Sequence, residues 1–305
     1  MERVDNCSHL TPSIHKVVML TNAVEIEDLT FCYQGTRQPA LRAVNLTIPR
    51  GEVAMLIGPT GAGKSTLYMC LNGLIPHLIQ GRVSGRVTIA GMDTSQHSIA
   101  NLAQKVGTVF QNPEVQLFSL TVRDELAFGP ENLALTKDDI FMRIDQAVRA
   151  IGLMDLLERE PAKLSGGQQQ TVAIGAIWAM LPDVLIMDEP TSNLDPESSQ
   201  RVLRLIRKLN LEHGKTILIA EHKIDEVACF ADHVIVMNQG QIVLDGTPYE
   251  VFSQVDRLHD CGLVAPVATE IANRLQANGW TIDRLPLTVE EGIDVFSDLL
   301  GTARN

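Results

Sequence analysis

The stretch GPTGAGKST, from Gly58 to Thr66, decides the fold class of this 305-residue chain. It fits the pattern G-x-x-x-x-G-K-[ST] and lies between an apolar strand-like run, EVAMLI, and a helix-compatible run, TLYMCLNGL. Glycines at these places let successive backbone N–H groups point around phosphate oxygens without Cβ clashes. Lys64 would supply charge to the β- and γ-phosphates, and Ser65 would offer its hydroxyl to Mg²⁺. The stretch therefore predicts a nucleotide-phosphate site built from Gly58, Pro59, Thr60, Gly61, Ala62, Gly63, Lys64, Ser65 and Thr66.

A second run, VLIMDEP from Val184 to Pro190, predicts a buried strand that ends in acidic residues. Asp188 is expected to hold the metal ion, and Glu189 to act as the general base that polarises a water for attack on the γ-phosphate. Taken alone, Glu189 would be interpreted as a surface charge at a strand end, and the glycine-rich stretch as a simple turn. The catalytic interpretation is favoured because both motifs occur in one chain, with strand, loop and helix in the required order.

Composition limits the class of protein. Hydrophobic residues make up 45% of the chain and aromatic residues only 4%, which is typical of a globular α/β protein. A net charge of −12 argues against binding to nucleic acid through bulk electrostatics. The five cysteines are scattered and form no CxxC pair, so reduced thiols are favoured over disulfides or a zinc site. No secretory signal is expected, and the longest apolar run, Val172 to Leu181, is shorter than the ~20 residues that span a bilayer.

Hydrophobic periodicity predicts the secondary structure of the remaining chain. Apolar runs and alternation predict strands at 24–33, within 43–58, and at 85–93, 107–111, 183–190, 215–222 and 233–246, the last as a hairpin. Helical spacing predicts helices at 136–153, 195–214, 266–278 and 289–300. Thr136 and Asp195 are the expected N-caps of the first two helices. The helix at 195–214 connects two apolar strands, so a βαβ unit of a parallel sheet is expected there.

The motif LSGGQ, Leu164 to Gln168, follows these signals in an order that resembles the ATP-binding-cassette (ABC) ATPases over about residues 24–252. In that family two cassettes meet head to tail, and this signature loop of one caps the γ-phosphate held by the other. The resemblance implies that Ser165, Gly166, Gly167 and Gln168 contact ATP bound to a second cassette, identical or paralogous. The start of a helix is itself an anion site, and a helix N-cap made by the same residues is compatible with this role.

Four other positions take a role from the resemblance. Tyr33 matches the aromatic residue that stacks on adenine, with a core or surface tyrosine as the alternative. Gln111 matches the glutamine that touches Mg²⁺ and the attacking water, and His222 matches the histidine that contacts the γ-phosphate. The resemblance thus implies Glu189, His222 and Gln111 as catalytic residues, and Ser65, Gln111 and Asp188 as metal ligands. Ser192 to Asp195 would cross to the opposing site.

The resemblance also implies a fold and its divisions. We expect an α/β P-loop NTPase of the ABC ATPase type, with a mostly parallel sheet core, an N-terminal antiparallel β-subdomain, a helical subdomain insert and a small C-terminal α extension. Residues 1–22 would form an N-terminal extension and 23–252 the ABC ATPase domain. Within that domain the core would comprise 23–111 and 181–252, and the helical subdomain 112–180. Residues 253–305 would form the C-terminal helical extension.

The segments 109–135, AEHK around His222 and the C-terminal tail resemble the energy-coupling-factor (ECF) uptake systems for vitamins and for cobalt or nickel ions. In such systems two ATPases bind a transmembrane coupling protein, which works with a small substrate-binding membrane subunit. The resemblance implies an ATP- and Mg²⁺-dependent ATPase, peripheral at the cytoplasmic face of the cell membrane, that powers an importer and binds no nucleic acid. The helical insert would carry the groove for the coupling protein. Leu117 and Phe118 are candidates for that contact, with core packing as the alternative.

Other classes of protein share some of these features. A soluble ABC ATPase acting on ribosomes or DNA is disfavoured by the acidic charge, the single cassette and the lack of a basic arm. A regulatory cassette that binds ATP without hydrolysing it is disfavoured because Glu189 and His222 are both present. A small-molecule kinase with the same phosphate loop would have no use for LSGGQ. The sequence leaves open the transported substrate and the identity of the second cassette.

Overall fold

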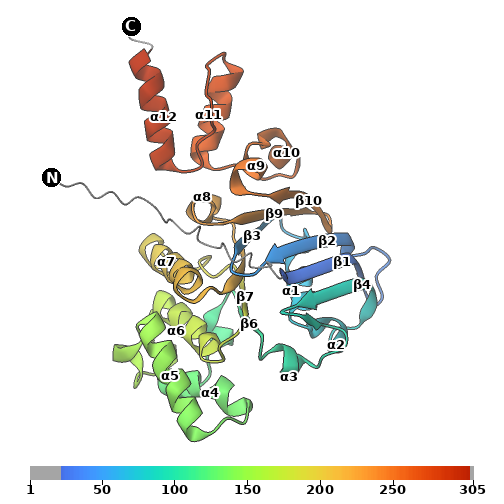
Figure 1. Cartoon of the computed structure of the whole chain (residues 1–305), viewed down its shortest axis with the longest axis vertical. Coiled ribbons are helices and arrows are strands. Elements are labelled where there is room, and N and C mark those ends of the chain that lie inside the picture. Colours follow the sequence, from blue (N-terminus) through green and yellow to red (C-terminus); the bar gives the residue numbers. More distant parts are fainter. Residues whose placement is uncertain (1–21, 303–305) are drawn as a thin grey trace, which may run out of the picture.

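The computed structural model describes residues 22–302, which form two sheets with helices around them (Figure 1). Almost all of the predicted N-terminal extension at 1–22 therefore lies outside the described residues. The antiparallel sheet has the order β2-β1-β4-β5, with β1 Asn22–Tyr33, β2 Leu41–Pro49, β4 Gly81–Ile89 and β5 Met92–Asp93. The second sheet has the order β10-β9-β3-β8-β7-β6. Its strands are β3 Val53–Ile57, β6 Val106–Val109, β7 Val184–Asp188, β8 Thr216–Ala220, β9 His233–Asn238 and β10 Gln241–Gly246.

Two strand predictions need correction. The single strand expected at 85–93 is two strands, because Ala90 and Gly91 both have positive φ angles and turn the chain between β4 and β5. The strand expected at 107–111 begins one residue earlier and ends at Val109, so Gln111 lies in the loop after it. The predicted hairpin at 233–246 is confirmed as β9 and β10, which pair antiparallel, whereas β3, β8, β7 and β6 run parallel.

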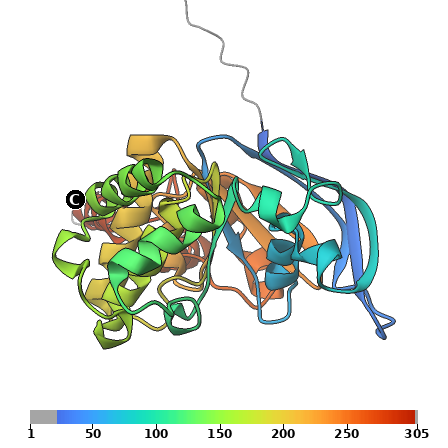
Figure 2. The same ribbon diagram turned by 90° about the horizontal axis from the view of Figure 1, so that it is seen from below.

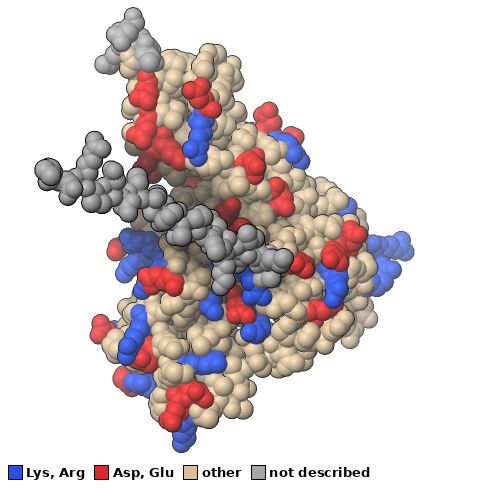
Figure 3. Space-filling model, in the orientation of Figure 1, with Lys and Arg blue, Asp and Glu red and all other residues tan. Residues whose placement is uncertain are grey.

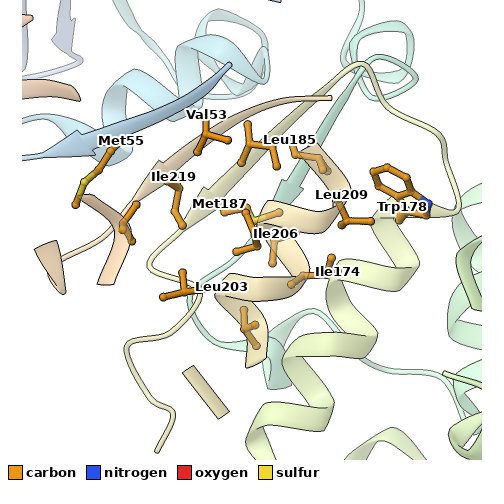
Figure 4. Packing of buried hydrophobic residues seen from close by; sticks show 14 of the residues in the cluster. Val53, Met55, Ile174, Trp178, Leu185, Met187, Leu203, Ile206, Leu209 and Ile219 are labelled. Carbon is orange, nitrogen blue, oxygen red and sulfur yellow. The ribbon is translucent and has the colours of Figure 1, made fainter. Parts of the chain in front are cut away.

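The six-stranded sheet is covered on both faces, as its continuous apolar strands predicted. Successive side chains of a strand point to opposite faces, so Val53 and Met55 of β3 enter one core cluster and Ala54 and Leu56 the other. The first cluster packs against helices α6 Gly166–Trp178 and α7 Pro196–His213 (Figure 4). The second cluster packs against the antiparallel sheet and α1 Lys64–Leu71. The sheet is therefore the central layer of the nucleotide-binding core.

The βαβ unit around α7 forms as predicted. The side chain of Asp195 caps the helix by accepting a hydrogen bond of 2.9 Å from the backbone N–H of Ser198. Gly214, with φ of 61°, ends the helix in the left-handed conformation that glycine adopts without strain. β7 and β8 on either side of α7 are neighbours in the sheet. The buried strand that carries Asp188 is thus fixed next to the strand that leads to His222.

A helical region lies between β6 and β7 and stands apart from the antiparallel sheet (Figure 2). Its elements are η1 Pro113–Val115, α4 Val122–Asn132, α5 Lys137–Ile151, η2 Met154–Leu156, η3 Pro161–Lys163 and α6. Thr136 caps α5 as predicted, through its side-chain oxygen and the N–H of Asp139. Ile144 and Val148 are buried on the inner face of this helix. This region provides the loop after Gln111 and the helix that follows the signature motif.

The C-terminal helices extend away from the sheets (Figure 1). α11 Val267–Ala277 and α12 Val289–Thr302 agree with the predicted pair, whereas the short helix α10 Val255–Asp260 was not predicted. The other short helices are α2 Leu74–His77, α3 Ile99–Leu102, α8 Ile224–Ala228 and α9 Pro248–Phe252. In the view of Figure 3 acidic side chains gather on the C-terminal part, and both signs of charge mix elsewhere on this face. No helix within residues 22–302 is long and apolar enough to cross a membrane.

Candidate functional site

The predicted catalytic residues meet at one edge of the six-stranded sheet. The parallel strands β3, β8, β7 and β6 are consecutive neighbours, so their carboxyl ends lie side by side. The phosphate loop follows β3, His222 follows β8, Asp188 ends β7, and Gln111 follows β6. Open α/β sheets bind ligands at this edge. The strand order therefore brings together residues that are more than a hundred positions apart in sequence.

The phosphate loop packs too closely for side chains at two of its glycines. A Cβ on Gly58 would lie 2.3 Å from the carbonyl oxygen of Met237, and one on Gly63 would lie 2.9 Å from that of Ala40. Gly63 has φ of 108° and is the N-cap of α1, with no side-chain hydrogen bond to the helix start. The first N–H groups of α1 therefore have no side-chain cap, and the helix end favours negative charge. This arrangement fits a phosphate group.

Lys64 lies at the first position of α1 and is buried, with 8% of its surface exposed. Its Nζ donates hydrogen bonds to the carbonyl oxygens of Gly58, at 2.6 Å, and Pro59, at 3.3 Å. Burial lowers the pKa of Lys64, while the nearby carboxylates of Glu189 and Asp188 oppose that shift. The ammonium group is thus held over the phosphate loop, with carbonyl oxygens as its hydrogen-bond acceptors.

Glu189 is bound from two sides. Its Oε2 accepts a hydrogen bond of 2.9 Å from Gln111 Nε2, and its Oε1 lies 2.8 Å from His222 Nε2. Glu189 has φ of 47°, a left-handed conformation that is uncommon for a non-glycine residue and that clusters at functional sites. Its backbone N–H is fixed by the carbonyl oxygen of Ala220, at 2.9 Å. The structure therefore places both Gln111 and His222 in direct contact with Glu189.

The donor groups expected to hold Mg²⁺ fit that ion. Within the described chain no group of three or more His, Cys, Asp and Glu side chains forms a metal cluster. Mg²⁺ does not need such a cluster, because it usually binds one or two carboxylates together with water and substrate phosphates. Asp188 provides the carboxylate, and Ser65 is exposed at the start of α1. Burial, followed by the repulsion of Glu189, raises the pKa of Asp188, so a cation beside it would stabilise its ionised form.

Tyr33 lies at the end of β1, next to the phosphate loop. Its hydroxyl is 3.0 Å from the hydroxyl of Thr66, and its ring packs edge-on against Phe31 with centroids 4.8 Å apart. A cavity of about 400 Å³ is lined by Tyr33 together with Cys32, Gln34, Gly35, Thr36, Gln80, Gly81 and Arg82. The Tyr33 hydroxyl thus contacts the end of the phosphate loop, and the residue also lines this pocket.

The signature loop differs from the phosphate loop in that side chains cap the helix that follows it. Ser165 caps α6 by accepting from the N–H of Gln168, and the Gln168 side chain accepts from the N–H of Ser165 in return. A Cβ on Gly167 would lie 2.7 Å from the Ser198 hydroxyl, so this glycine allows α6 to pack against the start of α7. The predicted N-cap is confirmed. Within the described residues no hydrogen bond or ion pair connects Ser165–Gln168 to the phosphate loop of the same chain.

Three residues of the site had no predicted role: Thr191, Glu221 and Lys223. Glu221 is 2% exposed and accepts hydrogen bonds from Thr191, and Lys223 also contacts Thr191. A sequence signal existed for Glu221, because an acidic residue directly after a buried apolar strand needs a partner. Sequence gave no means of identifying Thr191 as that partner.

Comparison with known proteins shows the family of the chain. A sequence profile described as ABC transporter matches residues 41–192. The chain is 43% identical over 275 residues to an ABC transporter ATP-binding protein of Pyrococcus horikoshii, which covers 90% of this chain and 96% of the relative. The chain therefore belongs to the ABC transporter ATP-binding proteins, and it is an ATPase whose activity is coupled to transport.

Further similarities are more specific. The chain is 40% identical over 281 residues to an energy-coupling factor transporter ATP-binding protein of Methanothermobacter thermautotrophicus, covering 91% of this chain and 88% of the relative. The solved structure of cbiO1 from Clostridium perfringens, part of the ABC transporter complex cbiONQ, matches with a TM-score of 0.71 at 35% identity over 84% of this chain and 99% of that one. A dimeric ATP-binding cassette bound to ADP and phosphate matches with a TM-score of 0.62 at 29% identity over 74% and 98%. These similarities confirm the fold class and support the ECF type.

Proposed function

We propose that the chain is the ATP-hydrolysing subunit of an ECF-type importer for a vitamin or a transition-metal ion. The observation that carries this proposal is the geometry around Glu189, whose two carboxylate oxygens bond Gln111 and His222 at the edge where Lys64 lies. A carboxylate held on both sides is oriented to accept a proton from the water that attacks the γ-phosphate. Hydrolysis would then depend on positioning and electrostatics more than on covalent chemistry.

ATP would bind across the start of α1. The backbone N–H groups of the phosphate loop would donate to phosphate oxygens, and Lys64 would exchange its carbonyl partners for a charged oxygen, which is the stronger acceptor. Mg²⁺ bound to Ser65, Gln111 and Asp188 would neutralise charge on the β- and γ-phosphates. The ring of Tyr33 would stack on the adenine in the adjoining pocket.

The signature loop would complete the site of a second cassette, identical or paralogous. Two observations support this assignment: among residues 22–302 no hydrogen bond or ion pair connects Ser165–Gln168 to the phosphate loop of the same chain, and a related cassette is known as a dimer with ADP and phosphate. The N–H groups at the start of α6 would bind the partner's γ-phosphate. Loss of that phosphate on hydrolysis would loosen the dimer, because ADP lacks the group that joins the two chains.

The membrane partner would bind to the helical region, proposed to span 112–180. Phe118 and Leu120 are 64% and 81% exposed there, and Phe118 packs edge-on against Phe128 with centroids 4.7 Å apart. The buried carboxylate of Glu125 fixes this loop by accepting from the N–H groups of Phe118 and Ser119. Exposed aromatic residues on a fixed loop are typical of a protein contact. Leu117, by contrast, packs partly buried against the core.

The membrane assembly would place the chain at the cytoplasmic face of the membrane as a peripheral subunit. A transmembrane coupling protein and a small substrate-binding subunit would be its partners. Two relatives support a transporter assembly: an energy-coupling factor transporter ATP-binding protein, and cbiO1 of the ABC transporter complex cbiONQ. The imported vitamin or metal ion would be selected by the membrane subunits, so no residue of this chain needs to touch it.

The catalytic role is tested with Glu189→Gln, which keeps the size of the side chain and removes its basicity. Turnover should fall by at least about a hundredfold, while ATP should still bind and hold two chains together as a dimer. Size-exclusion chromatography with ATP and a phosphate-release assay measure both effects. Glu197→Gln, on the exposed start of α7, is the matched control and should behave as wild type. Wild-type turnover of Glu189→Gln would disprove the assigned role.

The transport role is tested by affinity purification from detergent-solubilised membranes. Wild-type chain should bring down integral membrane subunits, and Phe118→Asp should lose them. Phe141→Asp is the matched control, since Phe141 is 62% exposed on α5 of the same helical region. Capture of ribosomal or other soluble components in place of membrane subunits would favour the alternative, a soluble ABC ATPase.

A further inference from the structure

The residues on both sides of His222 hold one and the same residue, Thr191. Glu221 Oε1 accepts hydrogen bonds from the Thr191 hydroxyl, at 2.7 Å, and from the Thr191 N–H, at 3.0 Å. Lys223 Nζ donates to the Thr191 carbonyl oxygen at 3.2 Å. All hydrogen-bonding groups of Thr191 are thus engaged by the two neighbours of His222. Thr191 itself is fully buried.

This arrangement is completed by two further bonds. The second oxygen of Glu221 accepts from the backbone N–H of His222, at 3.2 Å, so one carboxylate fixes both His222 and Thr191. Lys223 Nζ also donates to the Ser199 hydroxyl on α7, at 2.7 Å. Burial raises the pKa of Glu221, and its hydrogen bonds oppose that shift. A buried carboxylate is costly unless its acceptors are satisfied, and here both oxygens of Glu221 accept hydrogen bonds.

Thr191 connects this network to two other parts of the site. Two residues before it lies Glu189, whose carbonyl oxygen accepts from the N–H and the hydroxyl of Ser192. Three residues after it lies Leu194, whose N–H donates to the Thr191 carbonyl oxygen at 3.2 Å. The Leu194 side chain would lie 3.5 Å from a Cβ placed on Gly166. The turn 191–194 thus lies between the predicted catalytic base and the signature loop.

From these contacts we propose that Glu221, Thr191 and Lys223 form a clamp that positions His222 and the turn 191–194 as one unit. The proposal rests on the proposed function, because it assigns the clamp to the reaction that His222 and Glu189 would perform. Among the described residues, the side chains of the three clamp residues form no hydrogen bond to the side chains of Glu189 or Gln111. They are positioning residues: Glu221 sets the place of the His222 backbone, and Thr191 carries that position to the turn beside Glu189.

The clamp is tested in the full-length chain with Glu221→Gln. Glutamine keeps the size of the side chain but has one acceptor oxygen, so it can accept from Thr191 or from His222 and not from both. Turnover should fall by about ten- to a hundredfold, with the KM for ATP changed by less than about twofold, because misplacement affects the chemical step more than binding. Glu270→Gln is the matched control: Glu270 is also buried and accepts a backbone N–H, but it lies in the C-terminal helices.

Three further variants, Lys223→Met, Thr191→Ser and Thr191→Val, test the clamp if Glu221→Gln folds poorly. Lys223→Met removes the bonds to Thr191 and Ser199 from a partly exposed position and should lower turnover in the same way. Thr191→Ser keeps the hydroxyl and should retain turnover, whereas Thr191→Val removes it and should not. In a His222→Ala background, Glu221→Gln should add a smaller further loss than it causes in the wild type, because the part of its effect that acts through His222 is already gone. Full additivity in that background, or wild-type turnover of both Glu221→Gln and Lys223→Met, would overturn the clamp.

A measurement without hydrolysis separates this proposal from the proposed function. The Thr191 amide should exchange slowly with deuterium in the wild type, and exchange in the peptide containing 191–194 should accelerate in Glu221→Gln. Unchanged exchange would reject the clamp even if Glu189→Gln confirms the catalytic role. Faster exchange together with wild-type turnover of Glu189→Gln would leave the contacts in place and reject the function assigned to them.

Discussion

Two helices of this molecule begin with glycine-rich loops, but they satisfy their first N–H groups in different ways. At α1 the N-cap is Gly63, which makes no side-chain hydrogen bond to the helix. At α6 the N-cap is Ser165, which forms a reciprocal capping box with Gln168. The start of α1 therefore depends on a ligand for its best hydrogen-bond partners, whereas the start of α6 is already capped by its own residues.

This difference indicates what each loop is suited to do. The α1 loop, with a buried lysine beside uncapped N–H groups, is suited to hold a phosphate within one chain. The α6 loop is stable without a ligand, and the capping box leaves only some of its N–H groups for an anion. Such a loop suits a site that forms only when two chains associate. Its capping box already satisfies N–H groups at the start of α6 while the second chain is absent. Four predictions test this contrast.

The largest effect is expected for removal of the α1 charge. Lys64→Ala should abolish measurable ATP binding and lower turnover by about a thousandfold, because the phosphate charge loses its main partner in the loop. Lys163→Ala is the matched control, since Lys163 precedes the other loop and is exposed, with Glu160 as its ion-pair partner. Nucleotide titration and phosphate release measure the two variants. If Lys64→Ala and Lys163→Ala lowered ATP binding and turnover equally, the proposed difference between the two loops would be wrong.

The second prediction concerns packing at the α6 loop. Gly167→Ala would place a Cβ 2.7 Å from the Ser198 hydroxyl, whereas a Cβ on Gly166 would meet Leu194 at an ordinary 3.5 Å. Gly167→Ala should therefore cost about 1–3 kcal/mol in unfolding free energy and reduce turnover, while Gly166→Ala changes stability little. Adding Ser198→Gly should recover part of the loss, since it removes the atoms in conflict. Urea unfolding curves test this order, and equal stability of the two alanine variants would contradict it.

The third prediction concerns the capping box itself. Ser165→Ala should lower the unfolding free energy by about 1 kcal/mol in the absence of nucleotide, because the N–H of Gln168 loses its acceptor. Binding of ATP to the same chain's α1 loop should stay unchanged, whereas turnover should fall. Ser165→Thr retains the cap and serves as control for stability. Weakened ATP binding to a monomeric Ser165→Ala chain would show that this loop serves its own nucleotide.

Sequence predicted the α1 loop more fully than the α6 loop, for physical reasons. Residues within one local motif, such as Gly63 and Lys64, follow from strand, turn and helix signals alone. The caps at Thr136, Ser165 and Asp195 also follow from local patterns and are confirmed. Contacts between distant segments do not: the bonds of Gln111 and His222 to Glu189 depend on strand order, which a single sequence does not determine.

Two other features of the structure were not predicted from the sequence. Periodicity did not separate β4 from β5, because apolar alternation continues across the turn at Ala90 and Gly91. The clamp on Thr191 joins the ends of two neighbouring strands, so neither local segment reveals it. Of the residues assigned through family resemblance, Gln111 and His222 lie with Glu189 at one sheet edge, whereas Tyr33 and Ser165–Gln168 lie on other elements.

The smallest effect is expected at the opposite edge of the sheet, where neither helix start is involved. His233 begins β9 and contacts Asp245, with Glu52 3.7 Å away, and the hydrogen bond to Asp245 raises the pKa of His233 above its usual value of about 6.5. Because the pKa of His233 is higher in the folded chain than in the unfolded chain, the protonated imidazole stabilises the fold. This stabilisation is fully present below the unfolded-state pKa and is lost as the pH rises through the folded-state pKa. Asp245→Asn should therefore destabilise the chain more at about pH 6 than at about pH 9.

Urea unfolding at the two pH values measures this effect, with His233→Gln as the control that removes the titrating group. In the His233→Gln background the Asp245→Asn change should have the same cost at both pH values. ATP binding to the α1 loop should be unaffected by either variant at a given pH, because both side chains lie at the amino ends of the parallel strands. If ATP affinity falls together with the unfolding free energy in Asp245→Asn, loss of sheet stability alone weakens ATP binding. The effects of variants at the starts of α1 and α6 could then not be assigned to the hydrogen bonds of each loop.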